Sequence, residues 1–335
     1  MSAGVKADAL LRANPETVIW GAIAADRAPV LRIRSGQTVK IEAISQQPLN
    51  HEDPATFFPK VGVPLDQVLP EVIAIYREVK KSPPGSSHVL TGPIHIEGAE
   101  PGDMLEVRIL DVAFRVPYGL NNIGPGSGVL PDLLTERVSP LIRLDLERKV
   151  ALFAGGIEIP LTPFMGIMAV APPPERAPAS TKPPAEWGGN MDCKQLVAGS
   201  TLYLPVFNAG ALFYTGDGHA TQGDGEVDGA SIEISLSPTL HFVVHKGAGT
   251  IMKWPRAEDA ANYYVMGMDE DLDIALKESV REAVEFMQTR AHLTPAEAYA
   301  VASFAVDFRI GEAVNQVKMV YGVIPKKLFQ GERSK

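Results

Sequence analysis

Hydrophobic and polar residues alternate along several short stretches of the chain, which is the pattern of half-buried β-strands. The alternation in 29–45 continues on both sides of a turn at 35–37, and the alternation in 89–112 on both sides of a turn at 98–103. Because short glycine turns commonly join antiparallel neighbours, each stretch predicts a β-hairpin. The same alternation predicts further short strands within 141–170, 201–207, 231–237, 239–246 and 313–323.

Three other segments have the three- and four-residue spacing of amphipathic helices. This spacing predicts a short helix within 66–81 and a long one over 271–290, where apolar residues form one stripe opposite charged ones. A third helix is predicted to begin at Thr294, because its side chain can cap the helix while Glu297 reaches back and Pro295 occupies the favoured first position.

Strands come first in the chain and the clearest helices last, so we predict an α+β fold dominated by β-structure. A proline-rich stretch at 171–184 predicts an extended surface connector, and strand-like sequence on both sides suggests that the two halves share one sandwich. We expect a β-rich core at 1–246 that carries the functional site and a helical C-terminal part at 247–335 packed on it.

Composition and charge exclude several classes of protein. Of the 335 residues 45% are hydrophobic and 21% charged, a globular mixture, and the net charge of -9 without a basic stripe does not favour a nucleic-acid partner. No stretch approaches the ~18 apolar residues of a membrane span, and Asp8, Arg12 and Glu16 interrupt any secretory signal. Cys193 is the only cysteine, so intrachain disulfides are excluded. We expect a cytoplasmic protein that does not bind membranes.

Candidate chemistry is concentrated in two glycine-rich segments, 188–193 and 216–229, which adjoin predicted strands. Asp192, Asp217 and His219 have the oxygen and nitrogen donors of a divalent-metal site, and Glu226 or a neighbouring carboxylate has the chemistry of a base. Such a site could activate water against an amide carbonyl. The same composition is equally typical of an acidic turn without catalytic function.

Other mechanisms have weaker support. The chain has no nucleophile elbow, P-loop or dinucleotide-binding fingerprint. Asp224, Glu226 and Asp228 alternate as in an EF-hand, but Ser235 falls where the last carboxylate is required, so only a nonstandard calcium site remains open. Cys193 with His219 as base would form a thiol nucleophile, although a lone cysteine is more often a packing residue. His51, His88 and His95 are further candidate ligands or proton carriers.

Several motifs are similar to those of the acetamidase/formamidase family. They include Gly-Gly-Asn-Met-Asp at 188–192 and Gly-Asp-Gly-His-Ala at 216–220, together with 91–94, 97–103, 199–206, 222–226, 305–309 and 314–318. The resemblance covers most of the chain from about residue 32 to residue 326, but it does not extend to 49–81, a segment that could cap the site and change which amide fits.

The resemblance implies hydrolysis of short aliphatic amides such as formamide and acetamide, a β-sandwich core with an appended α/β part, metal dependence and homo-oligomers. It assigns metal-ligand roles most directly to Asp192 and His219, and it makes Asp217, Asp224 and Glu226 site candidates. It gives His95 no role.

We therefore predict a metal-dependent amidohydrolase, with zinc as the first expectation for the ion and calcium as the alternative. The predicted ligands are Asp192, His219 and Asp217, the predicted proton-transfer residue is Glu226, and the predicted substrate contacts are Asn190, His88 and Asp224. Two alternatives remain: a noncatalytic metal or small-ligand binding protein, and a cysteine-dependent amidohydrolase that uses Cys193.

Overall fold

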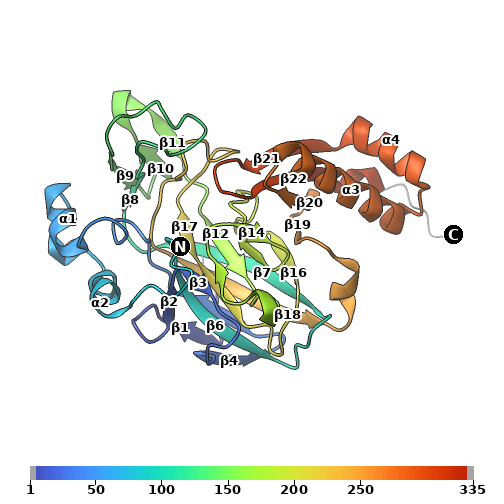
Figure 1. Ribbon diagram of the computed structural model, residues 1–335, viewed down its shortest axis with the longest axis horizontal. Helices are drawn as coiled ribbons and strands as arrows, with labels where there is room; N and C mark the ends of the chain where they lie inside the picture. Colours follow the sequence, from blue (N-terminus) through green and yellow to red (C-terminus); the bar gives the residue numbers. More distant parts are fainter. Residues whose placement is uncertain (1–4, 330–335) are drawn as a thin grey trace.

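A computed structural model describes residues 5–329, and two large β-sheets dominate it (Figure 1). The nine-stranded sheet has the order β1 (Ala9–Leu11), β5 (Thr38–Ile41), β18 (Leu236–His245), β7 (Met104–Phe114), β16 (Thr201–Pro205), β19 (Arg256–Glu258), β20 (Asn262–Asp269), β22 (Lys318–Pro325) and β21 (Asp307–Glu312). The seven-stranded sheet has the order β14 (Pro184–Ala185), β15 (Gly188–Asn190), β12 (Phe164–Ala169), β17 (Phe213–His219), β6 (Val89–Glu97) and β2 (Val18–Trp20), with β4 (Leu31–Arg34) also paired to β6.

The two sheets share one hydrophobic core. Phe213 of β17 and Phe242 of β18 meet across it, with ring centroids 5.0 Å apart and an interplanar angle of 71°. Both aromatic residues are fully buried, and such edge-to-face pairs add to the stabilisation from buried area. The fold is the expected β-dominated α+β fold with a sandwich core.

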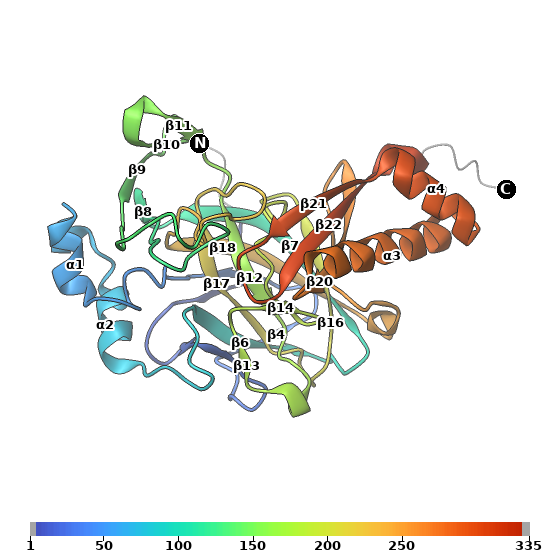
Figure 2. The same ribbon diagram turned by 45° about the horizontal axis from the view of Figure 1, so that its top comes forward.

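Smaller elements lie around the sandwich (Figures 1 and 2). A four-stranded sheet comprises β8 (Tyr118–Leu120), β9 (Leu141–Asp145), β10 (Val150–Leu152) and β11 (Glu158–Pro160), and a pair comprises β3 (Ala22–Ile23) and β13 (Ala179–Ser180). The 3-10 helices are η1 (Leu65–Gln67), η2 (Ala154–Gly156), η3 (Pro174–Arg176), η4 (Ala248–Ile251) and η5 (Lys326–Phe329).

The helices lie at opposite ends of the molecule, α1 (Pro54–Lys60) and α2 (Pro70–Glu78) at one end and α3 (Leu272–Ala291) and α4 (Pro295–Ala305) at the other (Figure 1). The predicted long helix is confirmed as α3, which Asp271 caps. The predicted capping box of Thr294 and Glu297 is confirmed at the start of α4. The helix predicted within 66–81 corresponds to α2, which begins at Pro70, and the residues before it form η1. No helix within residues 5–329 combines the length and the hydropathy needed to cross a membrane.

Residues after 246 extend the larger sheet as well as forming helices. Strands β19 to β22 continue the sheet beyond β16, and α3 packs on β20. At Gly267 of β20 a Cβ atom would lie only 2.2 Å from the backbone nitrogen of Ser279, so glycine is what allows the helix to approach this closely. The strand predicted within 313–323 corresponds to β22, which begins at Lys318.

Both predicted hairpins are wrong in their pairing, although their strands and turns are correct. Strand β4 pairs with β6, whereas β5 pairs with β1 and β18. Likewise β6 pairs with β17 and β2, whereas β7 pairs with β18 and β16. Each turn therefore connects the two sheets instead of joining neighbours within one sheet. The alternation indicates that a strand has one buried face, but it does not say which strand lies beside it.

Candidate metal centre

Strand β17 presents Asp217 and His219 from one side, since residues two apart in a strand share a face. Strand β12 lies beside it, and the chain after β15 brings Asp192 to the same place, where its backbone N–H donates to the carbonyl of Gly166 at 3.3 Å. Asp192, Asp217 and Glu226 have left-handed backbone conformations, with φ of 45°, 59° and 44°. Nonglycine residues rarely adopt this region, and those that do cluster at functional sites.

The three predicted ligands converge on the space above Gly166. A Cβ atom at this position would lie 2.5 Å from Asp192 Oδ1, 2.7 Å from Asp217 Oδ2 and 2.9 Å from His219 Cε1. His219 Nε2 is 3.3 Å from Asp217 Oδ2, and His219 Nδ1 is 4.0 Å from Asp192 Oδ1. The absence of a side chain on Gly166 is therefore what leaves room between the three donors.

Two of these donor atoms are buried without a hydrogen-bond partner among the described residues, namely Asp192 Oδ1 and His219 Nε2. An unpaired buried polar atom is costly and requires a physical reason. Asp192, Asp217 and His219 each have one donor atom within 4.8 Å of the others, which is the separation that a shared cation could bridge. The residues thus fit a metal ion in both chemistry and spacing.

Two glutamates enlarge the cluster beyond the predicted ligands. Glu226 and Glu233 each have a carboxylate oxygen within 4.8 Å of a nitrogen of His219, and Glu233 Oε1 is 3.5 Å from His219 Nε2. Glu233 also accepts hydrogen bonds from the backbone N–H and the hydroxyl of Ser231, at 3.1 and 3.2 Å. The centre is therefore one histidine surrounded by carboxylates from several parts of the chain.

Hydrogen bonds from neutral side chains hold the cluster in place. The Gln46 amide donates to Asp217 Oδ1 at 2.7 Å and to Glu233 Oε2 at 2.8 Å. Gln222 contacts His219 Nδ1 at 2.9 Å and donates to the Asp192 carbonyl at 2.9 Å. Because Gln222 accepts through its Oε1, His219 carries its proton on Nδ1 and directs Nε2 toward the carboxylates.

Burial determines the electrostatics of the cluster. It raises the pKa of Asp192 and of Glu226 well above the usual carboxyl values, and repulsion between Glu226 and Asp192, and between Glu233 and Glu226, adds to the effect. Burial and the charge of Asp217 raise the pKa of Glu233 to about 8. So many carboxyl groups cannot all ionise in a dry site without a compensating cation.

His219 and Asp217 form the ionised pair of the cluster. Burial alone would lower the pKa of His219, but the charges of Asp217 and Glu233 outweigh it and raise this pKa to about 10. Burial would raise the pKa of Asp217, but the charges of His219 and His88 outweigh it and lower that pKa. In the protein without a cation, His219 thus binds a second proton and itself supplies the positive charge.

The three predicted substrate contacts have different surroundings. The Asn190 amide donates to Asp192 Oδ2 at 2.6 Å, and His88 Nε2 lies 3.8 Å from Asp217 Oδ2 while its Nδ1 is 3.0 Å from the Thr181 hydroxyl. Asn190 and His88 therefore lie directly behind the ligands. Asp224 points away from the cluster toward Lys194, at 3.0 Å, and the Tyr321 hydroxyl, at 2.7 Å.

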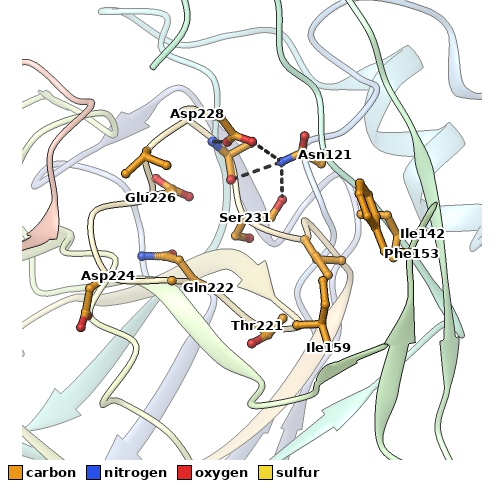
Figure 3. A pocket seen from close by; sticks show the side chains of 14 residues that line it. Asn121, Ile142, Phe153, Ile159, Thr221, Gln222, Asp224, Glu226, Asp228 and Ser231 are labelled. Carbon is orange, nitrogen blue, oxygen red and sulfur yellow. Dashed lines mark hydrogen bonds between the residues drawn. The ribbon is translucent and has the colours of Figure 1, made fainter. Parts of the chain in front are cut away.

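A cavity of about 450 Å³ adjoins the cluster on the side of Glu226 (Figure 3). It lies between the four-stranded sheet and the loop after β17, and its lining comprises Asn121, Ile142, Phe153, Ile159 and the residues at 221–224, 226–228 and 230–232. Glu226 has 8% of its surface exposed, whereas Asp192 and His219 have 1%. Glu226 is therefore the carboxylate of the cluster that is nearest to solvent.

Cys193 follows Asp192 in the chain but is fully buried. Burial raises the pKa of its thiol to about 12, so the thiol is protonated at neutral pH. A nucleophilic cysteine needs an environment that lowers this pKa, so the surroundings of Cys193 favour a packing role.

Sequence reasoning did not identify Gln46, Glu233, Glu312 or Asn315. Glu233 lies between Ile232 and Ile234, on the polar face of an alternating segment, and this pattern resembles a solvent-exposed face. Glu312 is fully buried and accepts from the side-chain amide of Asn315, which also donates weakly to Asp192 Oδ2 at 3.5 Å. Only the fold brings these residues to the cluster, and of the four only Asn315 lies in a motif of the family resemblance, at 314–318.

A β-sandwich here buries a histidine among carboxylates beside an open cavity, and these side chains have the donor atoms and spacing of a candidate metal site. The family model described as "Acetamidase/Formamidase family" matches residues 76–178 and 175–331, and the chain belongs to this family.

Among characterised relatives, the acetamidase of Mycolicibacterium smegmatis is 28% identical over 220 residues, which cover 48% of this chain and 54% of the relative. The formamidase of Methylophilus methylotrophus is 28% identical over 196 residues, or 42% of this chain and 47% of the relative. The chain thus aligns with about half the length of these relatives.

Solved structures match over nearly the whole chain. The acetamidase of Bacillus halodurans has a TM-score of 0.79 at 28% identity and covers 96% of this chain and 99% of its own. The acetamidase of Yersinia enterocolitica has a TM-score of 0.78 at 25% identity, and the match covers 98% of this chain and 94% of the acetamidase. The fold is therefore that of the family throughout.

Proposed function

We propose that this protein hydrolyses short aliphatic amides, such as formamide and acetamide, to ammonia and the carboxylate. Membership of the acetamidase/formamidase family supports this activity, and so do the names of its relatives. The observation that carries the proposal is the convergence of Asp192, Asp217 and His219 above Gly166, with two buried donor atoms that lack partners within the described residues.

Asp192, Asp217 and His219 would hold a divalent ion, for which zinc is our first expectation and calcium the alternative. An ion in such a site polarises an amide carbonyl and lowers the pKa of water, which a neutral amide requires. The mixed nitrogen and oxygen donors favour zinc over calcium, which prefers oxygen ligands alone.

The protein's own side chains orient the metal ligands and supply a proton to the leaving group. Asn190 fixes Asp192, Gln46 fixes Asp217, and Gln222 fixes the tautomer of His219. Glu226 approaches His219 and also lines the cavity, and burial raises its pKa well above the usual carboxyl value, which favours the acid form that protonates the departing ammonia.

The test is ammonia release from formamide and acetamide by the purified protein, before and after chelation and after return of zinc or calcium. We expect activity that disappears with chelation and returns with zinc. Bound metal without ammonia release would instead support a noncatalytic binding protein. Full activity in a Cys193→Ala variant would exclude the cysteine mechanism. A cytoplasmic location and a homo-oligomeric state remain predictions.

A further inference from the structure

The cavity shown in Figure 3 adjoins the cluster through a few side chains that line the cavity and contact the cluster, whereas Asp192, Asp217 and His219 are not part of its lining. Glu226 lines the cavity and approaches His219, Gln222 lines it and contacts His219 Nδ1, and the Ser231 hydroxyl donates to Glu233. A molecule in the cavity would therefore meet the cluster at one end only.

The opposite wall of the cavity is apolar and comes from the four-stranded sheet. Ile142 of β9, Phe153 and Ile159 of β11 form it, and Figure 3 shows them across the cavity from Glu226. Its volume of about 450 Å³ lies in the range of sites for molecules much larger than formamide. A substrate with an apolar chain could bury that chain against this wall, which formamide cannot do.

Charge restricts the ligand further. The carboxylates of Asp224 and Asp228 line the cavity, and no lysine or arginine is found among the described residues of the lining. Lys194 offsets only Asp224. A carboxylate at the end of the substrate away from the amide would be repelled, whereas an uncharged chain would not.

We propose that the preferred substrates are uncharged linear amides with an apolar acyl chain longer than that of acetamide, such as butyramide or hexanamide, whose chain packs on Ile142, Phe153 and Ile159. This inference rests on the proposed amide hydrolysis. In that reaction a water oxygen bonds to the carbonyl carbon, the C–N bond breaks, and the nitrogen leaves as ammonia with a proton from the water.

The first experiment compares kcat/KM of the metal-loaded wild-type protein for formamide, acetamide, butyramide, hexanamide and succinamate. We expect butyramide to exceed acetamide about tenfold or more, because each methylene in an apolar pocket contributes at least about that factor. Succinamate, in which a carboxylate replaces the end of the chain, should fall far below butyramide. A flat or falling series from acetamide to hexanamide would overturn the proposal, and equal rates for succinamate would overturn its charge selectivity.

A second experiment tests whether the apolar wall of Ile142, Phe153 and Ile159 causes the preference for longer acyl chains. Ile159→Ala should lower the ratio of the butyramide to the acetamide kcat/KM about tenfold, since it removes the chain's contact surface. Ile157→Ala is the matched control, because Ile157 lies on the same hairpin, is 55% exposed and does not line the cavity. An unchanged ratio in a folded Ile159→Ala protein would contradict the assignment.

Calorimetry separates failure of this inference from failure of the proposed function. If no amide yields ammonia, the proposed function fails, and binding of butyramide and acetamide then tests the cavity directly. Saturable butyramide binding that is tighter than acetamide binding and weakened in Ile159→Ala would support the cavity's preference. Absence of butyramide binding would overturn it.

Discussion

At the scale of single residues, a glycine and three strained acids define the centre. Asp192, Asp217 and Glu226 adopt left-handed backbone conformations, each of which costs of order 1–3 kcal/mol unless the surrounding structure enforces it. The Gln46 amide holds Asp217, the Asn190 amide holds Asp192, and backbone hydrogen bonds with Gly223 and Gly229 hold Glu226. The geometry is therefore preorganised by the protein and does not depend on flexible side chains.

We expect Gly166→Ala to abolish metal binding, because the added methyl group would occupy the space into which Asp192, Asp217 and His219 direct their atoms. Overpacking of this kind also costs about 1–3 kcal/mol of stability. Metal content after dialysis is the decisive measurement, and circular dichroism shows whether the variant is folded. A folded Gly166→Ala protein with a full complement of metal would show that the ion binds elsewhere.

Glu226→Gln should lower kcat by about 10²- to 10⁴-fold, because the amide cannot exchange a proton with the reacting groups. Asp224→Asn provides the comparison, since Asp224 also lines the cavity but is paired with Lys194 and Tyr321. We expect a much smaller loss in that variant. Similar losses of kcat in both variants would mean that the rate depends on charge in the cavity and not on proton transfer by Glu226.

At the scale of elements, the connections between the sheets depend on local hydrogen bonds in their turns. Asp103 ends the turn between β6 and β7, where it accepts from the backbone N–H of Glu100 at 2.8 Å, the backbone N–H of Gly247 at 2.8 Å and the Lys246 ammonium at 2.6 Å. The buried Asp103 carboxylate thus fastens this turn to the end of β18. It explains why an aspartate follows the glycine of this turn.

We expect Asp103→Ala to reduce the free energy of unfolding by about 1–3 kcal/mol, because these donors lose their acceptor. Burial would raise the pKa of Asp103, but the hydrogen bonds from Lys246, Gly247 and Glu100 outweigh it and lower this pKa. A lowered pKa contributes stability above the unfolded value of about 3.9 and loses it as the pH falls below that value.

Urea unfolding at pH 7 and at pH 3 measures both effects. The difference between wild type and Asp103→Ala should shrink at the lower pH, because the unfolded chain takes up the Asp103 proton below its pKa of about 3.9. Asp132→Ala is a suitable control, because Asp132 is exposed in a loop and should leave stability nearly unchanged. A difference that is independent of pH would indicate that packing, and not the carboxylate charge, fastens the turn.

At the scale of the whole molecule, the C-terminal unit contributes to the centre as well as to the fold. The backbone N–H of Gly225 donates to the Gly311 carbonyl at 3.0 Å, and the backbone N–H of Ala313 donates to the Gly225 carbonyl at 3.0 Å. Glu312 is the last residue of β21, and Asn315 follows it. The Asn315 side-chain amide donates to Glu312 and also contacts Asp192. The loop that carries Glu226 is thereby fastened to the last strands of the chain.

We expect Asn315→Ala to weaken metal affinity about tenfold, since groups that orient metal ligands typically contribute 10- to 100-fold. Gln316→Ala is the matched control, because Gln316 is exposed and its side-chain amide donates to Glu270, away from the cluster. Titration with zinc in the presence of a competing chelator gives both affinities. Equal affinities in the two variants would place Asn315 outside the functional centre.

The sequence determined the local features of this protein. Alternation located about half of the described strands but not β17, and apolar spacing and capping residues located α3 and α4. The motifs at 188–192 and 216–220 brought Asp192, Asp217 and His219 forward as candidates. The predictions of secondary structure succeeded where they depend on residues close together in the chain, since backbone periodicity and side-chain capping act directly there. The roles of the three site residues stay predictions.

The tertiary structure alone decided which strands are neighbours and what surrounds the candidates. It placed the two strands of each predicted hairpin in different sheets. It also placed Gly166 beside the three donors and brought Gln46, Glu233 and Glu312 to the cluster. These contacts join residues far apart in sequence, and any strand with one apolar face could satisfy many partners. Only the packing of the complete sandwich selects one set, and with it the cavity that adjoins the site.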